Sequence, residues 1–209
     1  MSMLFDAPLI AGLRYGEEVI SAAEEEILIE RLIATDLSPF RFHGWLGNRK
    51  TRSFGWRYDF DDASFAATEA IPGWLLPLRE TAAAFAGIEP GEFLHVLLAR
   101  YDPGAGIGWH RDRDVFEQVV GFSLAAPATL RFRRRRPGGF DRANLDVSPR
   151  SAYLLSGEAR WDWEHSIVPG DDLRFSITFR ALSEKGRRSL LPLHERNGSR
   201  AERFCRHAA

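Results

Sequence analysis

A histidine and an aspartate two positions apart, His110 and Asp112, follow a glycine-rich turn in the segment YDPGAGIGWHRDRD. In extended chain, alternate residues point to the same side, so this imidazole and this carboxylate can share one metal ion. A third ligand is available in His165, 53 residues after Asp112. Two histidines and one carboxylate on one face leave coordination positions open, as at the non-haem Fe(II) sites of oxygenases. The spacing therefore predicts a metal centre, although an Asp two residues after a His also occurs by chance.

Other motifs in the same stretch are excluded. His-Arg-Asp at 110–112 is similar to a kinase catalytic loop, but no Asn follows at the required spacing and no Asp-Phe-Gly is present. The glycines at 104–108 are not a dinucleotide-binding GxGxxG, because Trp109 occupies the third glycine position. A single cysteine, Cys205, excludes a cysteine-rich iron or zinc site. We expect the remaining histidines to be core or surface residues: His43, His95, His194 and His207.

A second candidate feature is the alternating run RFSITFR at 174–180. On a strand its polar residues face one way and its apolar residues, 175, 177 and 179, face the other. The polar face comprises Arg174, Ser176, Thr178 and Arg180. Such a face can hold a dicarboxylate, with an arginine gripping one carboxylate through two charge-assisted hydrogen bonds. The alternative is an exposed sheet face with two solvated arginines; together with the His and Asp residues, the dicarboxylate pocket is favoured.

The elements that must position these residues are helices followed by strands. Ser21 and Glu24 form a capping-box pattern that predicts a helix over 21–34. Pro72 and Gly87 delimit a second helix over 72–86. Beyond residue 92, short apolar runs separated by Gly, Pro and Asp predict antiparallel strands of a sandwich or barrel: 93–101, 119–125, 128–134, 151–157 and 173–181. The fold class is therefore α+β.

Composition is that of one ordinary globular domain. The 209 residues are 44% hydrophobic and 27% charged, which excludes a disordered chain and a small disulfide scaffold. No apolar run approaches about 18 residues, so no membrane span is expected. The N-terminus has no basic flank, and Asp6 lies among its apolar residues, unlike a secretory signal. With one cysteine in the chain, we expect a cytoplasmic protein.

Charge is concentrated in two segments. Residues 131–142 carry a net charge of +5 and the tail 183–209 a net charge of +4, so the other residues sum to −10 within the total of −1. Basic segments on an acidic body can steer a polyanion to one surface. The arginine run at 131–136 is either a hairpin edge kept soluble by charge or a phosphate-contacting surface, and the second interpretation is slightly favoured.

Aromatic and basic residues also interleave at 40–60, with seven aromatic and five basic residues in 21 positions. Aromatic platforms with interleaved Arg suit stacking on a base while contacting phosphates. The alternating Phe54, Trp56, Tyr58 and Phe60 can equally be the buried face of one strand. Trp56 and Tyr58 are the candidates to line a substrate pocket.

Taken together, the ordered set resembles the AlkB family of Fe(II)/2-oxoglutarate dioxygenases over about residues 93–181. The set is Tyr101, His110-x-Asp112, His165 and Arg174-x5-Arg180, and the segments FGWRYDF and PGWLLPLRE resemble the family's N-terminal part. The resemblance implies a double-stranded β-helix, or jelly roll, with buttressing N-terminal helices. It implies helices and a nucleotide-recognition lid in 1–92, a catalytic core in 93–182 within the same domain, and a basic tail in 183–209.

The resemblance also implies roles. His110, Asp112 and His165 would ligate Fe(II), while Tyr101 and Arg174 would hold the cosubstrate 2-oxoglutarate. Arg180 would serve the cosubstrate or substrate side of the pocket, and Asp114 stands where some members contact the substrate base. Many members have Asn at the positions of Ala99 and Ser176, and both positions help to place the cosubstrate. This chain therefore departs from the family pattern at positions that bear on cosubstrate affinity or on its subfamily.

The implied reaction uses Fe(II), 2-oxoglutarate and O2 to dealkylate N-alkylated bases of DNA or RNA, with release of formaldehyde from an N-methyl group. Chemistry on a base requires extruding it from its stack. We expect a monomer acting on alkylated nucleic acid, away from membranes. Two alternatives stay open: an oxygenase acting on a protein or small molecule, and a noncatalytic nucleic-acid-binding module with a degenerate site.

Overall fold

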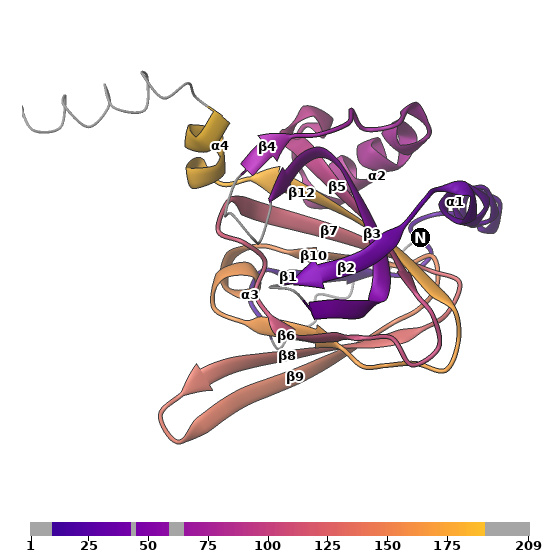
Figure 1. Cartoon of the computed structure of the whole chain (residues 1–209). Coiled ribbons are helices and arrows are strands. Elements are labelled where there is room, and N and C mark those ends of the chain that lie inside the picture. Colours follow the sequence, from indigo (N-terminus) through magenta and orange to yellow (C-terminus); the bar gives the residue numbers. More distant parts are fainter. Residues whose placement is uncertain (1–9, 43–44, 59–64, 191–209) are drawn as a thin grey trace, which may run out of the picture.

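Two facing β-sheets form the body of the protein (Figure 1). The computed structural model describes residues 10–42, 45–58 and 65–190, with only the backbone described at 40–42, 45–47, 57–58 and 65–66. The larger sheet has eight strands in the order β1-β10-β7-β12-β5-β3-β2, with β4 pairing to β3. Their bounds are β1 Leu13–Gly16, β2 Ser38–Phe42, β3 Trp45–Tyr58, β4 Phe65–Ala67, β5 Phe93–Tyr101, β7 Phe116–Leu124, β10 Ala152–Leu155 and β12 Arg174–Leu182.

The smaller sheet has the order β6-β11-β8-β9. Its strands are β6 Ile107–His110, β8 Ala128–Arg136, β9 Gly139–Val147 and β11 Glu164–Ile167. All pairings between neighbouring strands in both sheets are antiparallel. The expected α+β class and jelly-roll core are confirmed.

Helices cover the outer face of the larger sheet. The helical elements are α1 Ala22–Ala34, η1 Gly73–Leu75, α2 Leu76–Ala86, η2 Pro90–Glu92, α3 Gly157–Trp161 and α4 Glu184–Leu190. Leu28 and Leu32 of α1, with Leu78 of α2, pack in one cluster with Phe175 and Phe179 of β12. The apolar side of the run at 174–180 is thereby buried, as its alternation predicts. None of the described helices is long and apolar enough to span a membrane.

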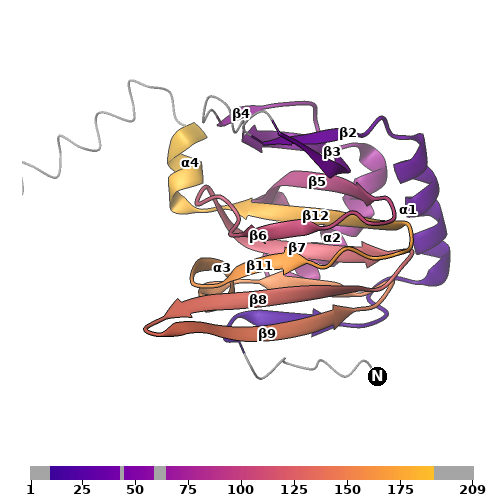
Figure 2. The same cartoon turned by 60° about the horizontal axis from the view of Figure 1, so that its bottom comes forward.

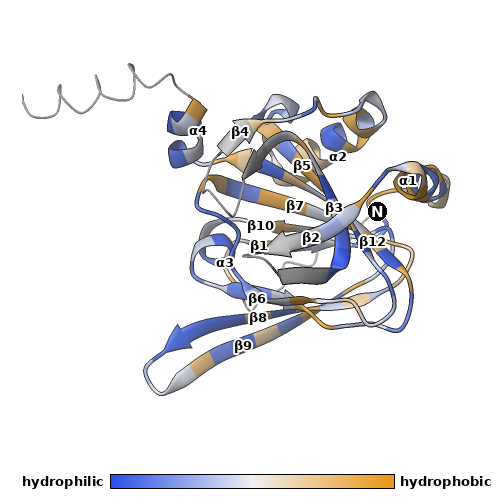
Figure 3. Ribbon diagram, viewed as in Figure 1, coloured by the Kyte–Doolittle hydropathy of each residue, from blue (hydrophilic) through white to orange (hydrophobic). Residues whose placement is uncertain are grey.

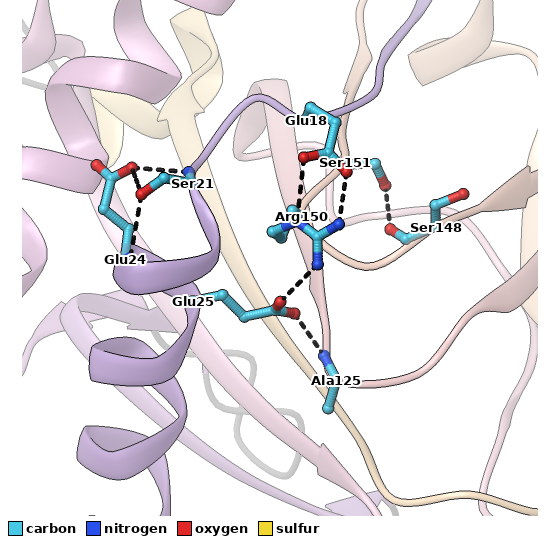
Figure 4. A network of polar contacts seen from close by, with 8 residues as sticks. All are labelled: Glu18, Ser21, Glu24, Glu25, Ala125, Ser148, Arg150 and Ser151. Atoms are coloured by element: carbon cyan, nitrogen blue, oxygen red, sulfur yellow. Dashed lines mark hydrogen bonds and ion pairs between the residues drawn. The ribbon is translucent and has the colours of Figure 1, made fainter.

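The two predicted helices are confirmed, with the expected caps. Ser21 accepts a hydrogen bond from the Glu24 backbone N–H, and the Glu24 side chain accepts one from the Ser21 N–H, which completes the capping box of α1 (Figure 4). Gly87 ends α2 in the left-handed conformation, with φ of 73°. Pro77 lies in the first turn of α2, where a missing N–H costs no helical hydrogen bond.

A buried carboxylate fastens α1 to the sheet. Glu25 accepts a hydrogen bond from the Ala125 backbone N–H at 2.9 Å and pairs with Arg150 at 3.2 Å (Figure 4). Arg150 also pairs with the exposed Glu18 at 2.6 Å. Ala125 and Arg150 both have positive φ, 72° and 64°, in the loops that follow β7 and β9. One helical side chain thus holds two strained turns in place.

A second core cluster fills the space between the two sheets. It joins Tyr101, Tyr153 and Leu155 of the larger sheet to Leu130 and Phe132 of β8 in the smaller sheet. The polar side of β12 faces this space, because its neighbours of opposite parity lie in the cluster under the helices. Figure 2 shows the smaller sheet in front of the larger one, with the β8–β9 hairpin extending beyond the other strands.

The five predicted strands are present, with β5 at the predicted bounds. Strands β1, β2, β4, β6, β9 and β11 were not predicted from the sequence, whereas β3 agrees with the interpretation of the alternating aromatic run as a strand, and Phe54 of that run is buried. Of the predicted basic tail, the structure describes α4; His194, Cys205, His207 and the remainder lie outside the described residues, as does His43.

Candidate active site

The two candidate histidines lie directly opposite each other on neighbouring strands. His110 ends β6 and is the register partner of His165 on β11, and their ring centroids are 4.3 Å apart. The Nδ1 of His110 lies 2.9 Å from the Gly108 carbonyl oxygen. A carbonyl only accepts, so Nδ1 carries the proton and Nε2 presents its lone pair to the space shared with His165.

Asp112 follows β6 and completes the group. Its side chain is 8% exposed, and one carboxylate oxygen, Oδ2, lies 3.9 Å from Nε2 of His165. The other oxygen, Oδ1, accepts a hydrogen bond from Nε of Arg180 at 3.1 Å and forms an ion pair with Nη2 of the same residue at 2.9 Å. Burial alone would raise the pKa of Asp112, but Arg180 and the two histidines outweigh it and hold that pKa below the ordinary value. The carboxylate is therefore charged and oriented.

Both histidines are neutral in this setting. Burial, and after it the neighbouring His110, lowers the pKa of His165 to about 3. Burial likewise lowers the pKa of His110. Metal ligation requires a neutral imidazole and an ionised carboxylate, so the three groups already stand in the protonation states that a divalent cation needs.

The donor set fits an Fe(II) ion after a small adjustment. Two ligands at right angles, each about 2.1 Å from an ion, lie about 3 Å apart, whereas His165 Nε2 and Asp112 Oδ2 are separated by 3.9 Å. Among the residues that the structure describes, no three His, Cys, Asp or Glu side chains already stand in ion-holding geometry. Two imidazoles and one carboxylate are the donors of a facial iron site, and the separation between His165 Nε2 and Asp112 Oδ2 must close by about 1 Å for one ion to bind both.

Arg174 is a buried cation with an unused donor. It is 4% exposed, and its Nε donates to the Ser123 hydroxyl at 3.1 Å. Its guanidinium carbon lies 4.9 Å from the ring centroid of Tyr101. Nη1 is buried without any hydrogen-bond partner. Buried donors are almost always paired, so this nitrogen fits a carboxylate of a bound dicarboxylate such as 2-oxoglutarate.

The two departures from the family pattern meet at one place. Ala99 of β5 and Ser176 of β12 are register partners, and Ser176 is in turn the partner of Ser123 on β7. This row of small side chains lies next to Arg174 on the inner face of the larger sheet. Many family members have Asn at both positions. In this chain small side chains therefore replace both amides at one place, next to Arg174.

Tyr153 of β10 is a buried residue of this region that sequence analysis missed. It is 7% exposed, and burial, followed by Tyr101, raises its pKa to about 12, so the phenol stays protonated. A Cβ on Gly121 would lie 2.5 Å from the Tyr153 hydroxyl oxygen and 2.3 Å from its ring carbon Cζ. The absence of a side chain at Gly121 therefore leaves the space that the Tyr153 ring occupies. A glycine inside the strand run VVGFSLA was the available signal, because such a glycine marks a close approach.

The buried His95 is a hydrogen-bond partner of Arg180. Its Nδ1 lies 3.4 Å from Nη1 of Arg180. Burial, and after it Arg180, lowers the pKa of His95 well below its usual value, so the neutral ring can accept this hydrogen bond. The expectation that Arg180 serves the pocket thus takes a specific form: it bridges His95 and Asp112.

The three candidate substrate residues stay predictions. Asp114 is exposed and pairs with Lys185 of α4 at 2.6 Å. Trp56 is half-buried on β3, opposite Ala67 of β4. The backbone of Tyr58 ends β3, but its side chain lies outside the described residues. The contacts described above bring together His110, Asp112, His165 and Arg180, and strand pairing places Tyr101, Arg174 and Ser176 on the neighbouring strands β5 and β12.

Sequence comparisons identify the family and the relatives that this chain resembles. The family model described as "2OG-Fe(II) oxygenase superfamily" matches residues 21–180. The chain is 28% identical over 165 residues to the Mus musculus tRNA (carboxymethyluridine(34)-5-O)-methyltransferase ALKBH8, covering 76% of this chain and 24% of that protein. It thus spans about a quarter of that relative's length. It is 27% identical over 154 residues to the alpha-ketoglutarate-dependent dioxygenase AlkB of Salmonella typhimurium, covering 68% of each chain.

A solved structure shares the fold. The structure titled "The structure of OsALKBH1" superposes with a TM-score of 0.62 at 15% identity, covering 81% of this chain and 96% of the other. At this identity the likeness supports the jelly-roll architecture alone.

Proposed function

Because this chain belongs to the 2OG-Fe(II) oxygenase superfamily, we propose that it removes alkyl groups oxidatively from N-alkylated bases of DNA or RNA. The chain is an AlkB-like dioxygenase that uses Fe(II), 2-oxoglutarate and O2. The observation that carries the proposal is the cluster of His110, Asp112 and His165 together with the buried Arg174, whose Nη1 has no hydrogen-bond partner among the described residues. Nucleic acid as the substrate class is supported by the names of two relatives, the Mus musculus tRNA methyltransferase ALKBH8 and the probable RNA/DNA demethylase ALKBH6 of Danio rerio.

The chain's own residues divide into two tasks. We assign His110, Asp112 and His165 to hold Fe(II), and Arg174 with Tyr101 to bind the far carboxylate of 2-oxoglutarate. When bound, the iron and the cosubstrate supply an oxidant that hydroxylates a C–H bond while 2-oxoglutarate becomes succinate and CO2. On an N-methyl group, hydroxylation gives a hemiaminal that releases formaldehyde and restores the unmodified nitrogen.

Arg180 is assigned as a positioning residue. Its hydrogen bond and ion pair to Oδ1 of Asp112 leave Oδ2 directed at His165. They also keep the carboxylate ionised in a buried place, which would otherwise favour its neutral form. In the apoprotein the same ion pair offsets the cost of burying the Asp112 charge.

The test is release of formaldehyde and succinate from an N-methylated oligonucleotide with Fe(II), 2-oxoglutarate and air. Wild-type protein should release both, and His110→Ala should release neither while keeping a cooperative thermal unfolding transition. Formation of succinate without any oligonucleotide turnover, lost in His110→Ala, would contradict the nucleic-acid substrate and redirect the search to proteins and metabolites. Absence of succinate with every substrate, with salt-sensitive nucleic-acid binding retained, would contradict catalysis itself.

A further inference from the structure

The β8–β9 hairpin projects beyond the rest of its sheet. Pairing between β8 and β11 stops at Arg133 and Glu164, whereas pairing between β8 and β9 continues to Arg136 and Gly139. The free part of the hairpin lies past the strand ends that carry the two candidate iron-binding histidines. Phe132, the residue before Arg133, contacts His165 with ring centroids 6.3 Å apart. In Figure 2 the hairpin tip extends past α3 at this end of the sheets.

The two faces of this hairpin differ in charge. On one face, Arg134 and Arg136 pair with Asp141 at 3.4 and 3.2 Å, and Arg134 also pairs with Glu158 of α3 at 3.1 Å. These ion pairs neutralise most of that face. In Figure 3 the projecting part of β8 is strongly hydrophilic.

The opposite face, which we call the arginine face, consists of Arg133, Arg135, Phe140 and Arg142. Arg133 and Arg142 are register partners, as are Arg135 and Phe140, so all four side chains leave the same side of the hairpin. Arg133 pairs with Glu164 at 2.5 Å. In the part of the chain that the structure describes, no carboxylate pairs with Arg135 or Arg142, and both are exposed.

Aromatic rings hold these guanidinium groups in order. The guanidinium carbon of Arg133 lies 4.5 Å from the ring centroid of Trp109 and 4.8 Å from that of Phe140. Arg142 lies 5.5 Å from the Phe140 centroid. Cation–π contacts order a guanidinium without neutralising it. The side chains therefore lose less conformational entropy when an anion binds.

This arrangement costs stability in the free protein. Like charges directly opposite on antiparallel strands repel each other, and Arg133 and Arg142 are such a pair. An edge strand needs only some charge to resist association with other chains, and the ion-paired face of the hairpin already supplies it. The arginine face carries three arginines and one acidic partner, so it has positive charge available to bind an anion from outside the protein.

We propose that the arginine face binds the phosphodiester backbone of a single-stranded nucleic acid, which rests on the proposed function. Arg133 and Arg135 are two residues apart on one strand, so their Cα atoms are separated by about 7 Å, a spacing suited to successive phosphates. Phe140 and Trp109 offer rings on which bases can stack. The body of the protein is acidic outside its two basic segments, so a polyanion is directed to this arm. The arginine face lies on the outer side of the smaller sheet, because Arg133 and Trp109 have the opposite parity to Phe132 and His110, which face the larger sheet.

The experiment compares two double variants that remove equal charge from the two faces. Arg135→Gln/Arg142→Gln strips the arginine face, and Arg134→Gln/Arg136→Gln strips the ion-paired face of the same hairpin. The probe is an unmodified, fluorescein-labelled single-stranded 12-mer, followed by fluorescence anisotropy over a salt series. Loss of two phosphate contacts lowers the slope of log affinity against log salt by about 1.4, because each contact contributes about 0.7 on single strands. We expect affinity to fall on the order of tenfold at 0.1 M salt in the first variant only.

Each outcome separates this inference from the proposed function. Equal losses in both variants, no loss in either, or no binding by the wild type would overturn the inference. Displacement of the oligonucleotide by poly-glutamate of equal charge would overturn it too, since it commits to nucleic acid. The thermal midpoint of Arg135→Gln/Arg142→Gln should be unchanged or higher, because repulsion is relieved. If the variant binds oligonucleotide normally while the wild type dealkylates it, only the inference fails; if the wild type shows the face-specific loss without dealkylation, only the proposed function fails.

Discussion

Replacing Arg174 by methionine should separate binding from stability. Methionine is unbranched, adapts to irregular cavities, and carries no charge. Among the described residues, Nη1 of Arg174 is a buried donor without a hydrogen-bond partner in the free protein, whereas Nε donates to the Ser123 hydroxyl at 3.1 Å. The guanidinium is thus poorly satisfied until a dicarboxylate arrives. Arg174→Met should therefore leave the apoprotein at least as stable as the wild type, and should abolish tight cosubstrate binding.

The magnitudes follow from hydrogen-bond energetics. Relief of one unsatisfied buried donor gains about 1–3 kcal/mol, while loss of the bond to Ser123 costs about 1 kcal/mol. The net change in the free energy of unfolding is about 0–2 kcal/mol in favour of the variant. Two charge-assisted hydrogen bonds to a carboxylate contribute about 3–6 kcal/mol, so 2-oxoglutarate should bind roughly 10²- to 10⁴-fold more weakly.

The assay is thermal unfolding with and without 2-oxoglutarate in the presence of Mn(II), supported by calorimetric titration. At a ligand concentration 100 times the wild-type dissociation constant, the wild type should gain about 2.7 kcal/mol, and Arg174→Met should gain at most about 0.4 kcal/mol. The control is Arg100→Met on the adjacent strand β5, where the arginine is part-exposed and pairs with Asp102 at 2.7 Å. A variant that keeps the 2-oxoglutarate shift, or whose apoprotein loses more than about 2 kcal/mol when Arg100→Met does not, would refute the reasoning.

Three further outcomes are expected. Gly121→Ala should destabilise the fold by about 1–3 kcal/mol in urea unfolding, because its Cβ meets the ring of Tyr153. Combining it with Tyr153→Phe should restore little stability, since the clash includes ring carbons. Full recovery of stability in the double variant would count against this account. Glu25→Ala should cost about 2–4 kcal/mol through its bonds to Ala125 and Arg150, whereas Glu18→Ala should cost at most about 1 kcal/mol, because that carboxylate is exposed; equal losses would show that burial is not the deciding factor. Chelation with EDTA should abolish succinate formation, and Fe(II) should restore it; activity that persists after exhaustive chelation would exclude the iron site.

Regular patterning made much of the framework predictable from sequence. The capping box at Ser21 and the alternation beginning at Arg174 each concern neighbours along the chain, and both appear in the structure. Strands β6 and β11 were not predicted, because four residues are too few for a period to show. They nevertheless carry His110 and His165, whose pairing depends on register between distant strands.

Side-chain partnerships across the sheets were similarly out of reach. The inward position of Tyr153 follows from its register with Gly121 on β7, which no local pattern contains. The pairing of Arg180 with Asp112 joins residues 68 apart. Residue types and order thus indicated the candidate iron ligands and the candidate dicarboxylate-binding arginine, but the roles of Arg180 as partner of Asp112 and of Tyr153 as partner of Gly121 became visible only from the pairing of strands.

The pairing of β1 with β10 has a consequence for biosynthesis. Leu13 is the register partner of Leu155, so β1 leaves the ribosome long before its partner strand β10 has been made. Contacts over such separations close slowly, and hydrophobic strands that wait for a partner expose the nascent chain to aggregation. The outer edge of the larger sheet therefore forms late in synthesis, and folding of this enzyme should depend on how long its N-terminal segment is kept from other chains.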